Sequence, residues 1–374
     1  MKKLFLTLTV ILLSVSFYPV KAMEKTADIL KKNVVTSGDG LYVDSTIDGR
    51  YIYKGGNPNN YIRLGDDLYR IISVEKDGTI KVIKQESIGD MAWDKENARY
   101  STNSEDFCTS DWGCKSWGSN TTTLDTNENK VTQMPREVKG TLKNLPAKEA
   151  TLNTYLNNEF YNSLSDDVKS LIVESTWNVG PTLYNQANLS ESVKEESAYK
   201  WKGKIALMNT TDYVKASTNS SCTNVSDYYN SSCYNNRSAH NYLYSNNYLW
   251  TISPVAESYA GCVFLIHDGF LERYSRVGDI GGVRPALFLS AKTILTGEGS
   301  EADPYKVSKY VEEVKEEPKD EENNNKDEIK ADKGQIVEVP STSAFGSIII
   351  AGLGIACVTG SAVIMGKTTR RREK

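Results

Sequence analysis

Two histidines and six cysteines are the side chains of this 374-residue chain that could most readily carry out chemistry. His267 is followed by Asp268, and an imidazole that is oriented by a carboxylate can act as a general base. However, adjacent residues of a strand point to opposite faces of a sheet, and Asp268-Gly269 is typical of a tight hairpin turn. We therefore interpret the pair as part of a turn and predict no catalytic residue in the chain.

The sequence contains no motif of a known hydrolase class. Gly-x-Ser-x-Gly, the turn that presents a nucleophilic serine in one large class, does not occur. Cys262 lies beside the apolar run 263–266, so we interpret it as a buried thiol rather than as an activated nucleophile. Carboxylates are plentiful, which leaves a glycosidase pair open, but their spacing does not locate one.

Four cysteines form two closely spaced pairs within polar, loop-like segments. In an oxidising compartment such neighbours join into local disulfides, which predicts Cys108–Cys114 and Cys222–Cys233. No Cys-x-x-Cys spacing occurs, so we predict no metal site of the zinc type. The oxygen-rich residues 44–49 leave calcium open, although a turn accounts for them as well, and we predict no cofactor.

Residues 211–260 are rich in Tyr, Asn and Ser. Tyrosine offers large and fairly rigid contacts, and Asn and Ser offer adaptable hydrogen bonds, the mixture that antibody binding surfaces use. This composition predicts a ligand-binding surface, and the alternative is a low-complexity loop held by the second disulfide. The candidate binding residues are Tyr228, Tyr229, Tyr234, Tyr242, Tyr244 and Tyr248.

The two ends of the chain have the composition of targeting segments. Residues 1–22 join two lysines to a short apolar run, the pattern of a removable signal peptide. Residues 344–366 carry no charge and are long enough to cross a bilayer as a helix, and a basic tail, residues 367–374, follows them. We therefore expect a single-pass protein of the cell surface with its N-terminal part outside the membrane.

Composition divides the rest of the chain into a folded part and a stalk. Residues 23–305 hold the aromatic and branched apolar residues that a core requires, so we expect one extracellular domain, or two. Residues 306–340 mix Glu, Lys and Asn and have almost no aromatic residue. Such a segment cannot bury enough apolar surface to fold, so we expect a disordered stalk, with a charged helix as the alternative.

Hydrophobic periodicity predicts both strands and helices in the folded part. Alternating residues over 51–53, 61–64, 68–74 and 79–83, with Asp-Gly at 77–78, predict an antiparallel meander. Apolar residues at helical spacing predict two helices within 147–174. Further strands are expected at 204–208, 250–253, 262–266 and 283–289. We therefore predict an α+β fold of antiparallel sheets with a few helices, followed by a C-terminal transmembrane helix.

Segments spread over residues 50–290 resemble an uncharacterised extracellular domain family of Gram-positive and mollicute-like bacteria. They include Leu-Tyr-Arg-Ile-Ile-Ser-Val at 68–74, Leu-Trp-Thr-Ile-Ser-Pro at 249–254 and Gly-Val-Arg-Pro-Ala-Leu at 282–287. The last two also resemble, more loosely, the closing strands of C-type-lectin-like and formylglycine-generating-enzyme-like domains. The resemblance implies a surface protein of unknown activity and a C-type-lectin-like fold, and it supplies no catalytic residue.

The residues before the apolar segment resemble the cell-wall sorting signal of Gram-positive surface proteins, in which Leu-Pro-x-Thr-Gly is cut by a sortase. The corresponding residues are Val339, Pro340, Ser341, Thr342 and Ser343. Proline and threonine match, whereas valine replaces leucine and serine replaces glycine, so the match is partial. The resemblance implies a sortase as partner and attachment to the wall, and a plain membrane anchor is the alternative.

The overall charge excludes one class of partner. The chain has 44 basic and 48 acidic residues and a net charge of −4, whereas nucleic-acid binding requires a basic surface. We therefore predict a binding module for an extracellular glycan or protein. A surface hydrolase acting on polysaccharide or peptide, and a structural protein of the envelope, are the alternatives.

Overall fold

The computed structural model describes most of the chain between residues 26 and 312 and one short segment after it. The described residues are 26–95, 108–109, 113–114, 117–118, 122–124, 131–133, 149–230, 233, 237–256, 262–312 and 334–338. The predicted signal peptide, the sorting motif Val339–Ser343, the apolar segment 344–366 and the basic tail lie outside them. All described residues belong to one compact unit of the chain, which ends at Thr342.

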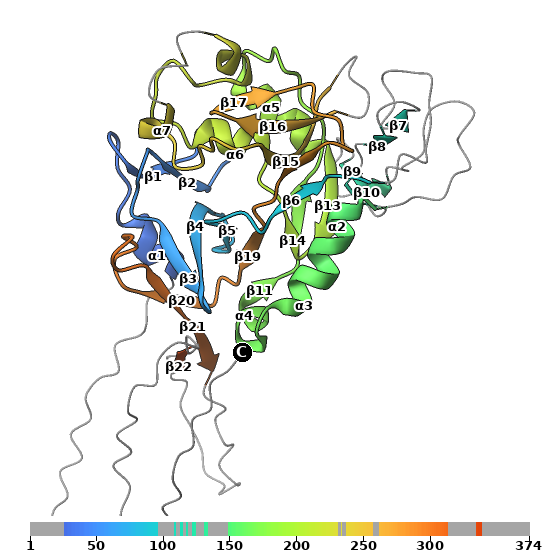
Figure 1. Ribbon diagram of the computed structural model, residues 1–374. Coiled ribbons are helices and arrows are strands. Elements are labelled where there is room, and N and C mark those ends of the chain that lie inside the picture. The colour runs from blue at the N-terminus through green and yellow to red at the C-terminus, as the bar shows by residue number, and fades with distance from the viewer. Residues whose placement is uncertain are drawn as a thin grey trace, which may run out of the picture. The chain divides into compact units, whose positions relative to one another are not determined.

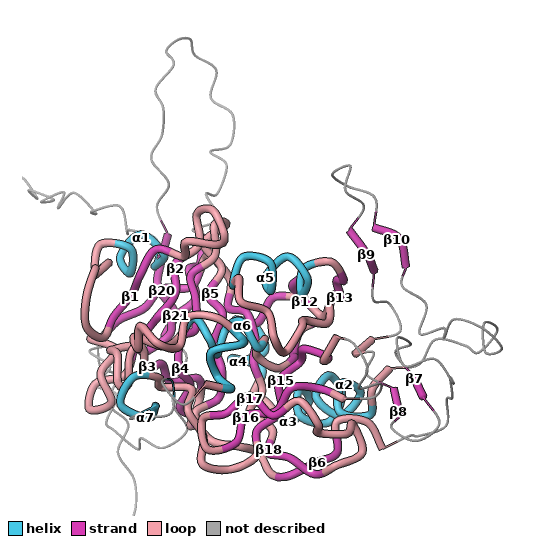
Figure 2. Tube along the Cα trace, turned by 90° about the horizontal axis from the view of Figure 1, so that it is seen from above, coloured by secondary structure: helices cyan, strands magenta, loops and turns pink. Residues whose placement is uncertain are grey.

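Strands outweigh helices in the described residues, as Figures 1 and 2 show. The longest α-helix among them, α5 (Leu189–Ser197), has 9 residues. The prediction of an α+β fold is therefore wrong, because the described chain is mostly β-sheet with a few short helices. Many of its strands have only two to four residues, which is too short for an alternating pattern to be recognised in the sequence.

The helices are short and most of them lie in the middle of the chain. Their bounds are α1 (Thr26–Lys31), α2 (Thr151–Tyr155), η1 (Leu156–Phe160), α3 (Tyr161–Ser163), α4 (Asp166–Leu171), α5 (Leu189–Ser197), α6 (Thr210–Lys215), η2 (Val225–Tyr229) and α7 (Arg237–His240). The two helices predicted within 147–174 are confirmed, and α4 begins at Ser165, whose hydroxyl accepts the Val168 N–H at 3.3 Å.

The prediction of a transmembrane helix finds no counterpart in the described part of the chain. Within those residues, no helix combines the length and the apolar composition that crossing a membrane requires. Residues 344–366, where the helix was expected, are not among them.

The predicted antiparallel meander is confirmed and forms the centre of the largest sheet. Its strands are β3 (Tyr61–Leu64), β4 (Asp67–Val74) and β5 (Ile80–Lys84), drawn in blue in Figure 1. Tyr61 pairs with Arg70 and Val74 pairs with Ile80. Gly78, in the turn between β4 and β5, has a φ of +88°, a conformation that a residue with a Cβ rarely adopts.

Strands from both halves of the chain complete this sheet. In the described residues its order is β11-β19-β5-β4-β3-β21-β20, with β2 joined to β4, β1 to β2, β14 to β19 and β22 to β21. The additional strands are β1 (Gly40–Val43), β2 (Tyr51–Lys54), β11 (Ile172–Val173), β14 (Ile205–Ala206), β19 (Ala286–Leu289), β20 (Thr293–Thr296), β21 (Tyr305–Glu312) and β22 (Gly334–Glu338). The strands β19 and β5 pair over four residues, so residues more than 200 positions apart share the sheet.

Three smaller sheets surround it in the described residues. One has the order β17-β16-β15-β18-β6, another the order β10-β9-β13-β12, and the last pairs β7 with β8. Their strands are β6 (Asp90–Ala92), β7 (Cys108–Thr109), β8 (Gly113–Cys114), β9 (Thr122–Leu124), β10 (Val131–Gln133), β12 (Ser175–Asn178), β13 (Tyr199–Gly203), β15 (Leu249–Pro254), β16 (Val263–His267), β17 (Phe270–Glu272) and β18 (Ile280–Gly282).

Buried tryptophans connect strands within these sheets. The fully buried ones are Trp93, Trp117, Trp177 and Trp250. Trp93 Nε1 donates to the Thr251 carbonyl at 3.1 Å, and Trp250 Nε1 donates to the Met91 carbonyl at 2.9 Å. These reciprocal bonds hold the segment around β6 against β15, and burial of each large apolar side chain contributes roughly 1.5–3 kcal/mol.

One predicted disulfide is present and the other remains a prediction. Cys222 and Cys233 are joined, with their Cα atoms 5.2 Å apart. Cys108 and Cys114 lie directly opposite each other in the antiparallel register of β7 and β8. Their side chains are not described. Cys262 is a buried thiol, as predicted.

The turn interpretation of His267-Asp268 is confirmed. Asp268 has a φ of +48° and Gly269 a φ of +76°, and together they connect β16 to β17 as a two-residue hairpin loop. A loop in which both central residues have positive φ matches the twist of the flanking strands. The local backbone therefore accounts for this pair of residues.

Strands occupy both ends of the segment that was expected to be a stalk. β21 and β22 pair antiparallel, with Ser308 opposite Glu338 and Glu312 opposite Gly334. The predicted stalk 306–340 therefore contains strand structure at each end, and residues 313–333 between the strands are not described. Aromatic and β-branched residues, which are common in strands, occur in both of these strands. They are Tyr305 and Val307 in β21, and Ile336 and Val337 in β22. The average composition of the segment does not reveal them.

Candidate functional site

The described residues line a polar cavity of about 480 Å³. Its wall comes from the loop between β1 and β2, from strands β5, β12 and β13, and from helices α5 and α6. Hydroxyl, amide and charged side chains dominate the wall, and Trp177 and Phe288 form its aromatic part. These elements are distant in the sequence, so only the assembled fold creates the cavity.

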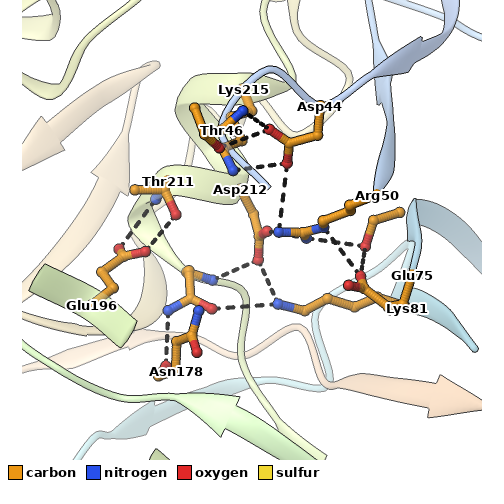
Figure 3. A network of polar contacts seen from close by, with 12 residues as sticks. Asp44, Thr46, Arg50, Glu75, Lys81, Asn178, Glu196, Thr211, Asp212 and Lys215 are labelled. Atoms are coloured by element: carbon orange, nitrogen blue, oxygen red, sulfur yellow. Dashed lines mark hydrogen bonds and ion pairs between the residues drawn. The ribbon is translucent and has the colours of Figure 1, made fainter. Parts of the chain in front are cut away.

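Asp212 is the centre of a buried ionic network beside the cavity (Figure 3). Its Oδ1 accepts from Arg50 Nη2 at 3.0 Å, and its Oδ2 accepts from Lys81 Nζ at 2.6 Å. Oδ2 also accepts the Asn209 N–H at 2.9 Å, a contact that helps to start α6. Burial alone would raise the pKa of Asp212, but Lys81 and Arg50 hold it well below its ordinary value.

Arg50 connects this carboxylate to two further acids. Its Nε lies 3.1 Å from Glu75 Oε1, its Nη1 lies 3.8 Å from Asp44 Oδ2, and its Nη2 also donates to Ser73 Oγ at 3.0 Å. Burial opposes the charge on Arg50, yet the surrounding carboxylates Glu75, Asp212 and Asp44 raise its pKa. The guanidinium therefore bridges the loop before β2 to α6 and to the end of β4.

Asp44 begins the oxygen-rich segment in which calcium was left open. Its Oδ1 accepts the N–H and the hydroxyl of Thr46, at 2.9 and 2.7 Å, and its Oδ2 accepts from Lys215 Nζ at 2.9 Å. This carboxylate therefore closes a turn and pairs with two cations. In the described part of the chain, no group of three or more His, Cys, Asp or Glu residues is arranged to hold a metal ion.

Lys81 also contacts the aromatic part of the wall. Its Nζ lies 5.1 Å from the centroid of Trp177 and 5.8 Å from that of Phe288. A cation over an aromatic face gains electrostatic stabilisation, more so when it is desolvated. The same ammonium thus joins the ionic network to the rings, and Trp177 is fixed in turn by donating from Nε1 to the Gly203 carbonyl at 3.0 Å.

Lys200, on β13, also lines the cavity. Its Nζ donates to the amide oxygen of Asn178 on the neighbouring strand β12. Burial opposes the charged form and lowers the pKa of Lys200 to about 8, although the nearby Glu196 partly offsets this effect. The protonation of Lys200 therefore depends on its burial and on the acidic group near it.

Glu196 lies behind the wall rather than in it. Its Oε1 accepts from Ser253 Oγ at 2.6 Å and from the Thr211 N–H at 3.2 Å, and its Oε2 accepts from the Thr211 hydroxyl. Complete burial raises its pKa to about 7, and the hydrogen bonds from Ser253 and Thr211 only partly oppose this rise. Glu196 therefore positions Thr211, whose side chain does line the cavity.

The tyrosines that were predicted to bind a ligand do not line this cavity. Tyr228 and Tyr242 are core residues, 1% and 7% exposed. Tyr229 is partly buried and meets Tyr184 edge-on with 5.8 Å between ring centroids. Tyr234 lies outside the described residues.

The remaining two tyrosines lie near the β16–β17 hairpin. Tyr244 donates from its hydroxyl to Asp268 Oδ1 at 2.6 Å. Tyr248 is 51% exposed and stacks on His267 with 3.9 Å between ring centroids. The five described tyrosines therefore do not share one exposed face, because three of them point into the protein.

Sequence reasoning missed the residues that build the cavity, although a signal was present. Lys81 is a single charge inside the apolar run Ile80–Ile83, and Asn209-x-x-Asp212 is a pattern that starts helices. Lys81 and Asp212 are both buried, and a charged side chain is rarely buried unless it is paired. A lone lysine in an apolar strand therefore predicts a buried acid, but it does not identify which one.

Comparison with known proteins finds one family model that matches part of the chain. Residues 126–291 match a family model described as a domain of unknown function (DUF6273). No curated protein matches the chain, and no solved structure matches it. The matched segment includes Lys200 and Asp212, whereas Arg50 and Lys81 precede it, so the cavity combines residues from inside and outside the matched segment.

Proposed function

We propose that this protein is a binding module for a small glycan, and that one or two sugar units occupy the polar cavity. The observation that carries the proposal is that buried ion pairs hold the wall in place before any ligand arrives. Asp212, Lys81 and Arg50 are each buried and joined to one another. Preorganised groups bind more tightly because less conformational freedom is lost on association.

The size and the chemistry of the wall support a sugar as ligand. Small-molecule sites measure about 300–1,000 Å³, and this cavity measures about 480 Å³. Its hydroxyl and amide side chains can bond the hydroxyl groups of a sugar, while the Trp177 and Phe288 side offers an apolar surface for C–H groups. The wall residues of these kinds are Thr46, Thr176, Asn178, Ser190, Ser197, Asn209 and Thr211.

The ionic state of the wall favours binding over hydrolysis. Most glycosidases pair an ionised carboxylate with a carboxylic acid that is still protonated near neutral pH. The wall carboxylates Asp212 and Glu75 are both held in ion pairs with Arg50. Glu196, whose pKa is raised to about 7, does not line the cavity. A hydrolase remains the second candidate only if a substrate can reach Glu196.

A location outside the cell accords with this function and rests on two observations. The first is the signal-like segment 1–22, and the second is the Cys222–Cys233 disulfide, since disulfides persist in oxidising compartments. The partial sorting motif Val339–Ser343 and the likeness to bacterial surface domains support a bacterial cell-surface setting. In that setting a sortase is the proposed processing partner.

The test is a glycan array with the full chain, followed by titration calorimetry of any sugar that binds. Ser197→Phe places a large ring in the cavity wall and should abolish binding. The matched control is Ala198→Phe, because Ala198 is exposed, adjacent and outside the wall. Binding that survives in Ser197→Phe, with both variants folded, would place the site elsewhere and reject this function for the cavity.

A further inference from the structure

We propose that the side chains of Lys200 and Asn178 are joined by an amide bond, which forms within the folded protein with loss of ammonia. This covalent modification goes beyond the proposed function and does not depend on which ligand occupies the cavity. Its chemistry requires a lysine amine held against an amide carbon, a partly buried setting, and a group that can carry a proton between the two nitrogens. The cavity wall and the carboxyl group behind it supply these requirements.

The two side chains are held together by neighbouring strands. Lys200 of β13 is directly opposite Asn178 of β12 in the antiparallel register, and its Nζ donates to Asn178 Oδ1. Because Cγ is bonded to Oδ1 at about 1.2 Å, the same contact brings Nζ close to Cγ. Two groups that a fold holds in such a position react far faster than the same groups in solution. The strand pairing therefore supplies the approach without any movement of the backbone.

Burial prepares Lys200 to act as a nucleophile. A lysine attacks only through its neutral amine, and burial lowers the pKa of Lys200 to about 8. Roughly one molecule in ten therefore carries the neutral amine at neutral pH. Both Lys200 and Asn178 line the cavity, so the ammonia that is released has space into which it can leave. Its departure makes the bond permanent even if the reaction is slow.

Glu196 is the group that can carry the proton. Its charge acts on Lys200 and partly opposes the lowering of the lysine pKa, so the two side chains are close neighbours. The chain around Asn178 also runs beside Glu196, because the Gly180 N–H donates to the Glu196 carbonyl at 2.8 Å. Burial raises the pKa of Glu196 to about 7. A carboxyl group with this pKa can both accept and release a proton near neutral pH.

The reaction balances without a further reactant. The neutral Nζ of Lys200 attacks Cγ of Asn178, so that the Nζ–Cγ bond forms and the Cγ–Nδ2 bond breaks. Nζ loses one proton, Glu196 passes that proton to the departing Nδ2, and ammonia leaves. No atom is oxidised or reduced. The product is a secondary amide that links β12 to β13 across 22 positions of the sequence, and it fixes one part of the cavity wall covalently.

Mass spectrometry of the full chain, purified and treated with reductant, tests the proposal. The wild type should weigh about 17 Da less than its sequence requires from the observed N-terminus, which is the mass of one ammonia. Trypsin should release a branched peptide in which Asn178 is joined to Lys200, and cleavage after Lys200 should be lost. A wild type of full mass would overturn the proposal. The same loss of mass without a branched peptide would indicate cyclisation of an asparagine and would also overturn it.

Two pairs of variants test the residues that take part. Lys200→Met should have its full mass, whereas Lys202→Met should retain the bond, because Lys202 lies on the same strand, pairs with Glu174 and is outside the wall. Glu196→Gln keeps the size of the carboxyl group but cannot exchange its proton, so it should stay unlinked. Glu191→Gln, at an exposed residue of the same helix, should become linked.

The outcomes separate the bond from the function proposed for the cavity. A branched peptide in Glu196→Gln would overturn the proton transfer assigned to this residue. A wild type of full mass that still binds a sugar would reject the bond and retain the glycan site. A linked wild type that binds no sugar would retain the bond and reject the glycan site. Circular dichroism of each variant establishes that it is folded, and the mass of the wild type decides the proposal even if a variant is not.

Discussion

Lys81 and Asp212 form a buried ion pair with 2.6 Å between Nζ and Oδ2, and the two side chains are 4% and 2% exposed. The pair joins β5, in the centre of the largest sheet, to the first turn of α6, and it spans 131 positions of the sequence. Together with Arg50 it fixes the wall of the cavity, so the stability of the fold and the shape of the site depend on the same contact.

Removing the central carboxylate should destabilise the protein strongly. Asp212→Asn leaves Lys81 and Arg50 buried without that partner, and breaking one side of a buried pair costs about 3–5 kcal/mol. Urea unfolding followed by tryptophan fluorescence measures the free energy of unfolding. The control is Asp48→Asn, which breaks the fully exposed Lys76–Asp48 pair and should change stability little. Equal losses in the two variants would show that the buried network contributes no special stability.

The pH dependence of stability should report Glu196. Its pKa is about 7 in the folded protein, against an ordinary value of 4.5, so the folded state retains the proton more strongly. The stabilisation is complete below pH 4.5 and is lost as the pH rises through about 7. We expect the wild type to lose about 3 kcal/mol over this interval relative to Glu196→Gln, since each pKa unit corresponds to about 1.4 kcal/mol.

Melting temperatures measured across the pH range test this expectation. Glu191→Gln is the matched control, because Glu191 is an exposed residue of the same helix, and it should follow the wild-type profile. Parallel profiles for the wild type and Glu196→Gln would mean that folding does not raise the pKa of Glu196, contrary to the environment described above.

The Cys222–Cys233 disulfide should contribute moderately to stability. Its sequence separation is 11 residues, and closing a loop of this size stabilises the folded state by about 3 kcal/mol in the chain-entropy description. Cys222→Ala with Cys233→Ala should lower the free energy of unfolding by roughly that amount. Peptide mapping without reductant identifies the bond directly, and it also tests Cys108–Cys114. Recovery of Cys222 as a thiol in the untreated protein would refute the pairing.

The tyrosines should divide into structural and exposed residues. Tyr242 is buried, its ring lies 4.9 Å from the Arg70 guanidinium, and its hydroxyl donates to the Ile71 carbonyl at 3.2 Å. Tyr242→Ala should therefore cost about 3–5 kcal/mol. Tyr248→Ala, at a residue 51% exposed, should change stability by less than about 1 kcal/mol. Sugar affinity measured for Tyr248→Ala should equal that of the wild type, and a loss there would favour the tyrosine surface over the cavity.

Local features of the fold were predictable because neighbouring residues decide them. Asp268-Gly269 predicted a hairpin turn, the alternation along β3, β4 and β5 predicted their meander, and Ser165 marked the start of α4. The fold class was not predictable in the same way, since strands as short as Ile172–Val173, which lie where helix was expected, are created by their partners rather than by their own pattern.

The sequence by itself determined the turns, the meander and the pairing of Cys222 with Cys233, since each depends on residues close together in the chain. Only the tertiary structure decided which buried charges meet. Lys81 and Arg50 both required a carboxylate, but many acids were available, and Asp212 was selected by the docking of α6 against the sheet. The cavity follows from that long-range choice, which no local preference of the chain specifies.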